Sequence, residues 1–366
     1  MRITKVRAVL HQVHNLITGW KISLGSRDVH DLIFVRIDTD KGVSGIGISS
    51  PGALYITGDT AANHLQIINN VFGPAILGAD PFDTEPIMLK LDSLALTAER
   101  AKSGIDLALY DVMGKALGLP VCKLIGGIVQ PRVRVTRLMG MYAPKEMAEK
   151  VKPIVQKGCT ALKLKVGTTL QEDVERVQRV REAVGPDITI TVDFNQACSP
   201  KEAIERLEKM DPYDVTLVEQ PVNAKDLKGM ALVRKAVRPL VMADESVNTP
   251  DEAMRIIDGE AADVISLKIP KMGGILKAKK IAALCEAAHV DYLVGTSPGS
   301  RLLDAGNVHL ASSLKGLTLP CEIAEFERMA DDPCTGLETI EGFLSPPQGP
   351  GLGVGLDLQK IGLPSQ

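Results

Sequence analysis

Charged residues end a series of short apolar segments that recur at nearly constant spacing along the second part of the chain. Asp193, Glu219 and Asp244 each follow an apolar run, and Lys165 and Lys268 stand in the same way at the two ends of the series. Successive members are 24 to 28 residues apart, which is typical of one strand, one helix and two loops. Because parallel strands of a barrel present their carboxyl ends at one mouth, we expect these five side chains to converge there.

Strand and helix patterns alternate from about residue 130 onward, which favours a parallel barrel or a doubly wound sheet. The predicted strands are 133–138, 161–166, 188–194, 215–220, 240–243, 264–269, 292–295 and 317–323. The predicted helices between them are 144–156, 170–184, 200–209, 227–236, 250–258, 275–288 and 302–314. Eight strands separated by seven helices fit a barrel, since crossovers between parallel strands are right-handed.

The first part of the chain shows a different pattern. Alternating segments at 31–37 and 43–48 flank a turn with Gly42, and an apolar helical face runs through 101–117. We therefore expect an α+β capping domain over residues 1–127 and the barrel over 128–330. The tail, 331–366, is rich in Pro and Gly and is expected to pack back on the cap.

Composition excludes several classes of function. The chain has 366 residues, a net charge of −3 and 3% aromatic residues, which gives no case for binding nucleic acid or an anionic membrane. No signal-peptide core and no apolar stretch of transmembrane length is present. Six scattered cysteines without metal-ligand spacing indicate reduced thiols. We expect a soluble cytoplasmic protein that acts on a small molecule; a homo-oligomer is compatible with this composition.

Three carboxylates from three consecutive strands suit a Mg²⁺ ion that keeps places for water and a substrate oxygen, with Mn²⁺ as a possible substitute. The predicted metal ligands are Asp193, Glu219 and Asp244. The alternative is that each carboxylate caps the helix that follows it. That alternative is the commoner one for a single residue, but it does not account for three acids in succession.

The lysines complete a site for proton abstraction. Lys163 and Lys165 lie two residues apart on one strand and point to the same side, where like-charge repulsion lowers the pKa of each. Lys165 can act as a base and Lys163 as a stabilising cation, while Lys268 lies across the barrel. Lys271 is expected at the surface or at a helix start. A carboxylate substrate on the metal would lose its α-proton to a lysine, leaving an enediolate.

These residues resemble the enolase superfamily, in its muconate-lactonising subgroup. The motifs that carry the resemblance are Lys163-x-Lys165, Asp193-x-Asn195, Glu219-Gln-Pro221, Asp244-Glu-Ser246, Lys268-x-x-Lys271, Asp106–Asp111 and Gly349–Gly353. The resemblance implies an α+β cap and a modified (β/α)₇β barrel of TIM type. It also implies Mg²⁺ at the three acids, acid/base roles for Lys165 and Lys268, and support from Lys163.

Two branches of the subgroup share features with this chain. Segments 55–60 and 220–229 are similar to dipeptide epimerases, whereas 349–357 is more like cycloisomerases. The chain departs from the family at Ile48 and Gly299, which replace acidic residues. It also has Cys321-Glu-Ile-Ala-Glu325 in place of the Asp-x-Asp that holds a dipeptide ammonium in the epimerases.

Other residues are candidates for substrate selection or for support of the metal site. They are Asn195, Glu245, Trp20, Tyr55, Ser297, Gly299 and Glu322. The alternatives are packing between the domains for Trp20 and Tyr55, and helix capping for Ser297. Glu322 and the nearby Glu325 are candidates to bind a cationic group of the substrate.

Together these observations predict a Mg²⁺-dependent racemase or epimerase of a carboxylate substrate, such as an amino-acid derivative or a dipeptide. The first alternative is a lyase reaction on the same scaffold, either a muconate-type cycloisomerase or a dehydratase of hydroxy acids. An alternative of another class is a non-catalytic barrel that only binds its ligand.

Overall fold

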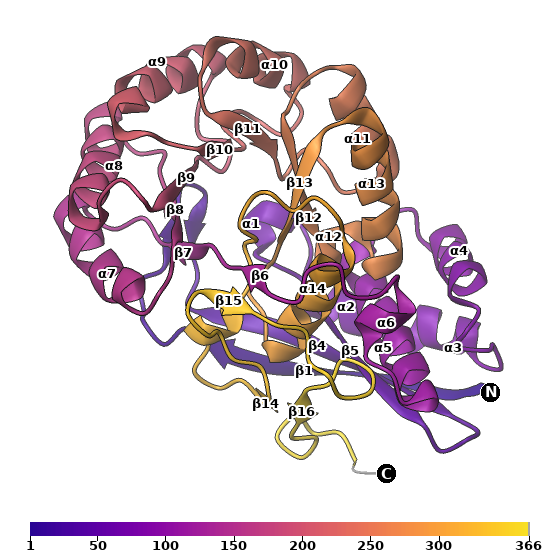
Figure 1. Cartoon of the computed structure of the whole chain (residues 1–366). Helices are drawn as coiled ribbons and strands as arrows, with labels where there is room; N and C mark the ends of the chain where they lie inside the picture. The colour runs from indigo at the N-terminus through magenta and orange to yellow at the C-terminus, as the bar shows by residue number, and fades with distance from the viewer. Residues whose placement is uncertain (365–366) are drawn as a thin grey trace.

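The computed structural model describes residues 1–364 and shows a curved parallel sheet surrounded by helices, with a smaller cap of sheet and helices beside it (Figure 1). This architecture confirms the predicted fold class. Seven parallel strands follow chain order around the sheet. They are β7 (Arg137–Met139), β8 (Ala161–Lys165), β9 (Thr189–Asp193), β10 (Leu217–Glu219), β11 (Leu240–Ala243), β12 (Val264–Lys268) and β13 (Asp291–Gly295).

The helices of the barrel lie outside the strands (Figure 1). They are α7 (Pro144–Gln156), α8 (Leu170–Val184), α9 (Pro200–Met210), α10 (Leu227–Ala236), α11 (Pro250–Asp258), α12 (Ile269–Met272), α13 (Ile275–Ala288) and α14 (Arg301–Ser313). Ser199 and Thr249 cap α9 and α11 in full capping boxes, and Pro follows each at the first helical position. These local signals explain why the predicted helix bounds are accurate to a residue or so.

The closing segment of the barrel differs from the prediction. The predicted strand 317–323 is reduced to a bridge at Cys321, whose N–H donates to Arg134 O at 2.8 Å and whose carbonyl accepts from Thr136 at 2.7 Å. Glu322 N donates to Val294 O at 2.9 Å, so this short segment joins β13 to the start of the barrel. Pro320 has no N–H to extend the pairing. The predicted strand 133–138 is likewise interrupted and contains only β6 (Val133–Arg134) and β7.

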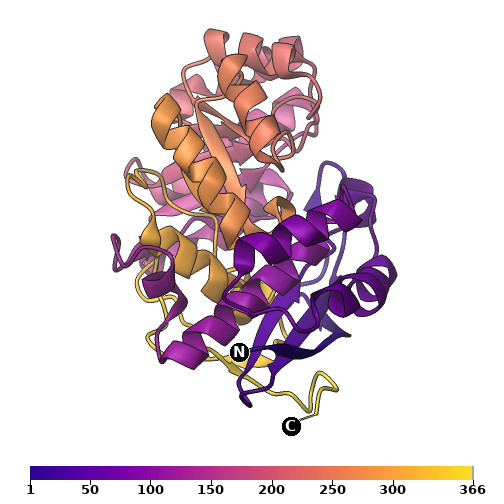
Figure 2. The same ribbon diagram turned by 90° about the vertical axis from the view of Figure 1, so that its right-hand side faces the viewer.

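The cap is built on an antiparallel sheet of β1 (Ile3–His14), β4 (Val29–Thr39) and β5 (Ser44–Ser49), packed against α5 (Glu99–Leu117). Figure 2 shows these elements beside the barrel. A Cβ at Gly45 or Gly47 would collide with the backbone of α5, so this close packing requires glycine. The smaller cap elements are β2 (Lys21–Ile22), β3 (Gly25–Ser26), α1 (Leu54–Thr57), α2 (Ala61–Ile67), η1 (Ile68–Phe72), α3 (Gly73–Ile76), α4 (Thr84–Leu94) and α6 (Val121–Leu124).

The C-terminal segment contains η3 (Glu325–Arg328), β14 (Cys334–Thr335), β15 (Phe343–Leu344) and β16 (Gly355–Leu356). It touches both parts of the molecule: Pro364 O accepts a hydrogen bond from Arg36 of the cap at 2.6 Å, and β15 pairs with β6. The three-part division of the chain remains a prediction. Within residues 1–364, no helix combines the length and the apolar character needed to cross a bilayer.

Two buried aspartates of α5 hold the cap to the rest of the chain. Asp111 accepts the backbone N–H of Ile46 at 2.8 Å and that of Leu352 at 2.9 Å, linking α5 to its sheet and to the tail. Asp106 accepts the N–H of Ile275 at 2.6 Å, at the start of α13. Gly274 lies against Asp106 with φ of 125°, where a Cβ would collide with the carboxylate. The motif 106–111 is therefore structural in this fold.

We expect Asp111→Ala to lower the free energy of unfolding by about 2 kcal/mol or more. The substitution leaves two buried N–H groups without an acceptor, each costing about 1–3 kcal/mol. Urea unfolding measures the change, and Asp111→Asn, which keeps one acceptor oxygen, should be intermediate. The control is Asp187→Ala at an exposed position, expected within about 0.5 kcal/mol of the native chain. Equal stability of Asp111→Ala and Asp187→Ala would contradict this role.

Candidate active site

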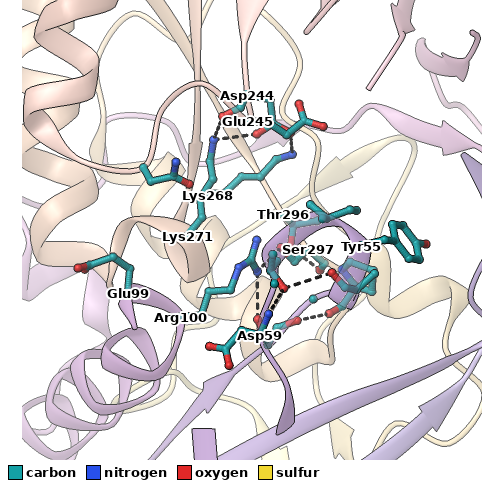
Figure 3. A pocket seen from close by; sticks show the side chains of 18 of the residues that line it. Tyr55, Asp59, Glu99, Arg100, Asp244, Glu245, Lys268, Lys271, Thr296 and Ser297 are labelled. Carbon is teal, nitrogen blue, oxygen red and sulfur yellow. Dashed lines mark hydrogen bonds and ion pairs between the residues drawn. The ribbon is translucent and has the colours of Figure 1, made fainter. Parts of the chain in front are cut away.

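The carboxyl ends of the barrel strands and three cap segments enclose a cavity of about 850 Å³ (Figure 3). The barrel contributes Lys163, Lys165 and Lys268 among others. The cap contributes residues near Trp20, α1 and the start of α5. The cavity is therefore formed by two regions that are distant in sequence.

Lys163 and Lys165 of β8 lie beside the carboxylates that end the next two strands. Lys165 Nζ is 2.5 Å from Asp193 Oδ2 and 2.8 Å from Asn195 Oδ1. Lys163 Nζ is 2.5 Å from Glu219 Oε2 and 2.5 Å from Glu322 Oε2, and 3.3 Å from Asp193 Oδ2. The alternation along β8 turns both ammonium groups inward, while Leu162, Leu164 and Val166 are buried in the apolar core.

Asp244, directly after β11, is surrounded by two lysines and a glutamine. Lys268 Nζ forms an ion pair with its Oδ2, and Lys271 Nζ lies 2.8 Å from its Oδ1. The amide of Gln220 fixes the backbone here, because its Oε1 accepts from Asp244 N at 3.0 Å and from Ser246 N at 3.2 Å. Gln220, which directly follows Glu219, thus positions Asp244, the next acid in the series.

The pKa values in this network follow from burial and from opposite charges. Burial disfavours the charged form of Lys163, but Glu219, Glu322 and Asp193 outweigh it and raise its pKa well above the usual value. The expectation that like-charge repulsion lowers the Lys163 pKa is therefore wrong for the site as the structure shows it. Burial also acts on Asp244, where Lys268 and Lys271 outweigh it and hold the pKa well below its usual range.

Glu219 and Glu245 have the opposite shift. Burial, together with repulsion from Asp193 and Glu322, raises the pKa of Glu219 well above its usual value. Burial and the adjacent Asp244 raise that of Glu245 to about 7. Negative charge at Glu219 is therefore incompletely balanced by the protein.

The donor set fits a divalent cation. Asp193, Glu219 and Asp244 are hard oxygen donors from adjacent strand ends, and Oε1 of Glu219 is buried without a hydrogen-bond partner. Within residues 1–364, no group of three His, Cys, Asp or Glu side chains is arranged to hold a metal ion. In this conformation, lysine ammonium groups lie between the three acids. The fit rests on donor chemistry and the unsatisfied oxygen.

The two cap loops reach the cavity, as the positions of Trp20 and Tyr55 predict. The Trp20 ring lines the cavity, and its centroid lies 3.7 Å from Cζ of Arg328 in η3. The ring also lies against Gly140 at the end of β7, so it packs between cap and barrel as well. Tyr55, on α1, lines the cavity and is packed against Gly25 of the neighbouring loop. Ser23 Oγ donates to Phe194 O at 2.9 Å and docks this loop on β9.

The remaining candidates divide into those in the site and those outside it. Ser297 lines the cavity, and Asn195 joins Lys165 to Glu245, with its Nδ2 3.1 Å from Glu245 Oε1. Glu322 is buried and bound to Lys163. Gly299 is packed against Leu303 and is not among the residues that line the cavity, and its role near the substrate stays a prediction.

Sequence reasoning missed Lys271, Arg100 and Gln220. Lys271 is buried against Asp244 rather than exposed, because Pro270 opens the short helix α12 and turns the lysine back into the site. Arg100 enters from the first turn of α5, and its Nη1 donates to Ser297 Oγ at 3.2 Å. No local pattern marks Arg100, since only the packing of cap on barrel brings it to the cavity.

Comparison with known proteins agrees with this geometry. The family described as Enolase C-terminal domain-like matches residues 146–360, and the Mandelate racemase / muconate lactonizing enzyme, N-terminal domain, matches residues 5–126. A hydrophobic dipeptide epimerase of Enterococcus faecalis is 37% identical over 336 residues, which are 91% of this chain and 94% of that protein. An N-succinyl-L-Arg/Lys racemase of Bacillus cereus is 35% identical over 81% of this chain and 80% of that protein.

Solved structures give the same result. The Bacillus cereus N-succinyl Arg/Lys racemase superposes with a TM-score of 0.95 at 31% identity, covering 99% of this chain and 97% of that one. The Enterococcus faecalis dipeptide epimerase complexed with Mg and L-Leu-L-Tyr superposes with a TM-score of 0.92 at 34% identity, covering 97% and 99%. The chain belongs to the mandelate racemase / muconate lactonizing enzyme family of the enolase superfamily, and it is an isomerase. Enzymes of this family depend on a metal ion.

Proposed function

We propose that this chain is a Mg²⁺-dependent racemase or epimerase that removes and returns the α-proton of an N-acylated amino acid or a dipeptide. The observation that carries the proposal is the placement of Lys165 and Lys268. They end β8 and β12, four strands apart in the sheet, and both line the same cavity. A substrate bound between them presents opposite faces of its α-carbon to two amines.

The two lysines divide the proton transfer. One lysine in its neutral form accepts the α-proton, and the electron pair of the C–H bond moves into the substrate carboxylate to give an enediolate. The other lysine, as an ammonium, donates a proton to the opposite face and inverts the centre. Lys163, which is buried, places positive charge near the position of the substrate carboxylate. The reverse reaction exchanges the two roles.

A Mg²⁺ held by Asp193, Glu219 and Asp244 would supply the positive charge that makes the α-proton more acidic. Gln220 keeps Asp244 in register with Glu219 through the backbone of 244 and 246. Asn195 orients Lys165 through its side-chain carbonyl. These contacts hold the acids and the base at fixed positions before substrate arrives.

The substrate class rests on the relatives rather than on the acids near the eighth strand position. Glu325 is paired with Arg328 and Glu322 Oε2 is paired with Lys163, but Glu322 Oε1 is buried without a hydrogen-bond partner. These acids therefore do not separate a dipeptide from an N-acylated amino acid. The relatives named above are a hydrophobic dipeptide epimerase and an N-succinyl-L-Arg/Lys racemase, and both names support an amino acid derivative or a dipeptide as substrate.

Two other functions compete with this one. Muconate cycloisomerase 1 of Rhodococcus opacus is 29% identical over 94% of this chain, below the epimerase and racemase named above. A dehydratase would use the same lysines for loss of a leaving group. A barrel that only binds ligand would leave the arrangement of Lys165 and Lys268 without a role.

We expect Mg²⁺ to bind with the three acids as ligands. Calorimetric titration of metal-free protein should detect binding, and Asp193→Asn or Asp244→Asn should weaken it at least about 10-fold, because each removes an anionic oxygen. The matched control is Asp59→Asn, since Asp59 is a carboxylate of the cavity wall that is bonded to His64. Mg²⁺ affinity equal to that of the native chain in both ligand variants would remove these residues from the metal site.

Incubation of N-acyl amino acids and dipeptides in D₂O tests the reaction. The native enzyme should return substrate of both configurations with deuterium at the α-carbon. Lys165→Met should slow inversion by about 10²–10⁴-fold and still exchange the α-proton of one stereoisomer, since Lys268 remains. Lys268→Met should exchange the other stereoisomer.

Exposed Lys201→Met is the control for these variants and should match the native rate. Circular dichroism checks that each variant is folded. Exchange of both stereoisomers at native rate in either catalytic variant would show that its lysine is not the acid/base group. Loss of water or ring opening without scrambled substrate would establish a lyase instead.

A further inference from the structure

Arg100 places a guanidinium in the cavity from the cap side. It lies in the first turn of α5, and Figure 3 shows it reaching into the cavity beside Ser297, below Lys268 and Asp244. Its Nη1 donates to Ser50 O at 3.0 Å and to Ser297 Oγ at 3.2 Å. These two contacts fix the plane of the guanidinium.

The other cations of the cavity wall are each paired with a carboxylate. Lys163, Lys165, Lys268 and Lys271 contact the acids of the barrel, Arg27 contacts Asp31 and Arg328 contacts Glu325. Arg100 forms no ion pair with any residue between 1 and 364. Its Nε and Nη2 donate to no acceptor within that range. Arg100 is thus the cavity cation that contacts no carboxylate directly, and only Asp244 and Asp59 attract it from a longer distance.

The acids that attract it, Asp244 and Asp59, and the neighbouring Glu99 make their hydrogen bonds elsewhere, Asp244 with Lys268 and Lys271. Asp59 accepts from His64 Nε2 at 2.8 Å and from Asn63 Nδ2 at 2.9 Å. Glu99 accepts from Lys102 at 2.9 Å and Lys277 at 2.8 Å. Burial lowers the pKa of Arg100 to about 10 against the attraction of Asp244 and Asp59, which still leaves it charged at neutral pH. A partly buried guanidinium with free donors and no carboxylate in contact indicates an anionic ligand.

We propose that the substrate carries a second carboxylate, remote from the inverted α-carbon, and that Arg100 with Ser297 forms the subsite that binds it. This inference rests on the proposed function and narrows its substrate class to acids with two carboxylates. The second carboxylate lies either at the end of the N-acyl group or in the side chain of an acidic residue. A guanidinium suits it, because its planar fork can donate two parallel hydrogen bonds to one carboxylate. Arg100 is then a specificity-determining residue, distinct from the lysines that move the proton.

Two matched pairs of acids test the subsite and distinguish the sources of the second carboxylate. In the first pair, an N-succinyl amino acid is compared with its N-butanoyl analogue, in which a methyl group replaces the carboxylate. In the second, L-Ala-L-Glu is compared with L-Ala-L-Gln. For the pair that matches the natural substrate, we expect kcat/KM for α-proton exchange to favour the dicarboxylate by about 10–100-fold, the range of a hydrogen bond between charged groups.

Arg100→Gln should abolish that preference by lowering kcat/KM for the dicarboxylate alone, and Arg100→Lys should restore part of it. The matched control is Arg27→Gln, which removes a paired arginine of the same wall and should leave the ratio between the two acids unchanged. No preference in either pair, or a preference that survives in Arg100→Gln, would overturn the proposal.

Calorimetry separates failure of the subsite from failure of the proposed function. Binding of the same four acids to Mg²⁺-loaded native protein and to Arg100→Gln requires no turnover. If no acid exchanges its α-proton but the dicarboxylate binds more tightly through Arg100, the subsite stands and the racemase reaction is wrong. If exchange occurs while native protein binds both members of each pair equally, the reaction stands and the subsite is wrong.

Discussion

The burial of opposite charges beside one another at the barrel mouth is the constraint on which this structure depends. Taking a carboxylate or an ammonium out of water is unfavourable unless each finds a partner. Lys163 shows how tightly the partners are placed, since it touches Glu219 and Glu322 while fully enclosed. Only a rigid frame of apolar strands can hold such groups in place, and that frame is the barrel.

The cap completes the site through a second set of interactions. These are mostly polar and lie away from the lysines and acids at the barrel mouth. Asp106 and Asp111 fasten α5 to the barrel and to the tail, and Arg100 extends from the first turn of the same helix into the cavity. The helix that joins the two parts thus also carries a side chain of the site. In the proposed function, the barrel provides the proton chemistry and the cap residue Arg100 selects the substrate.

Much of the site could be predicted from short-range patterns. Asp193 and Glu219 end buried strands and Asp244 directly follows one, so strand polarity alone places them at one mouth. Helix caps such as Ser199 and Thr249 are equally local, and the helices they begin were predicted closely. Features that depend on residues far away in the sequence were missed or predicted wrongly. They are the broken strand pairing around Cys321, the raised pKa of Lys163 and the buried position of Lys271.

The sequence by itself determined the alternation of strands and helices, the order of charged strand ends and, through its motifs, the family. These depend on periodicity and on residue chemistry, which act over a few residues. Only the tertiary structure decided which charges neutralise one another and which one is left without a partner. Arg100 illustrates the reason: its environment is made by Ser50 and Ser297, which lie 50 and 197 residues away in the sequence. Electrostatic balance is a property of such long-range proximity, and no local pattern encodes it.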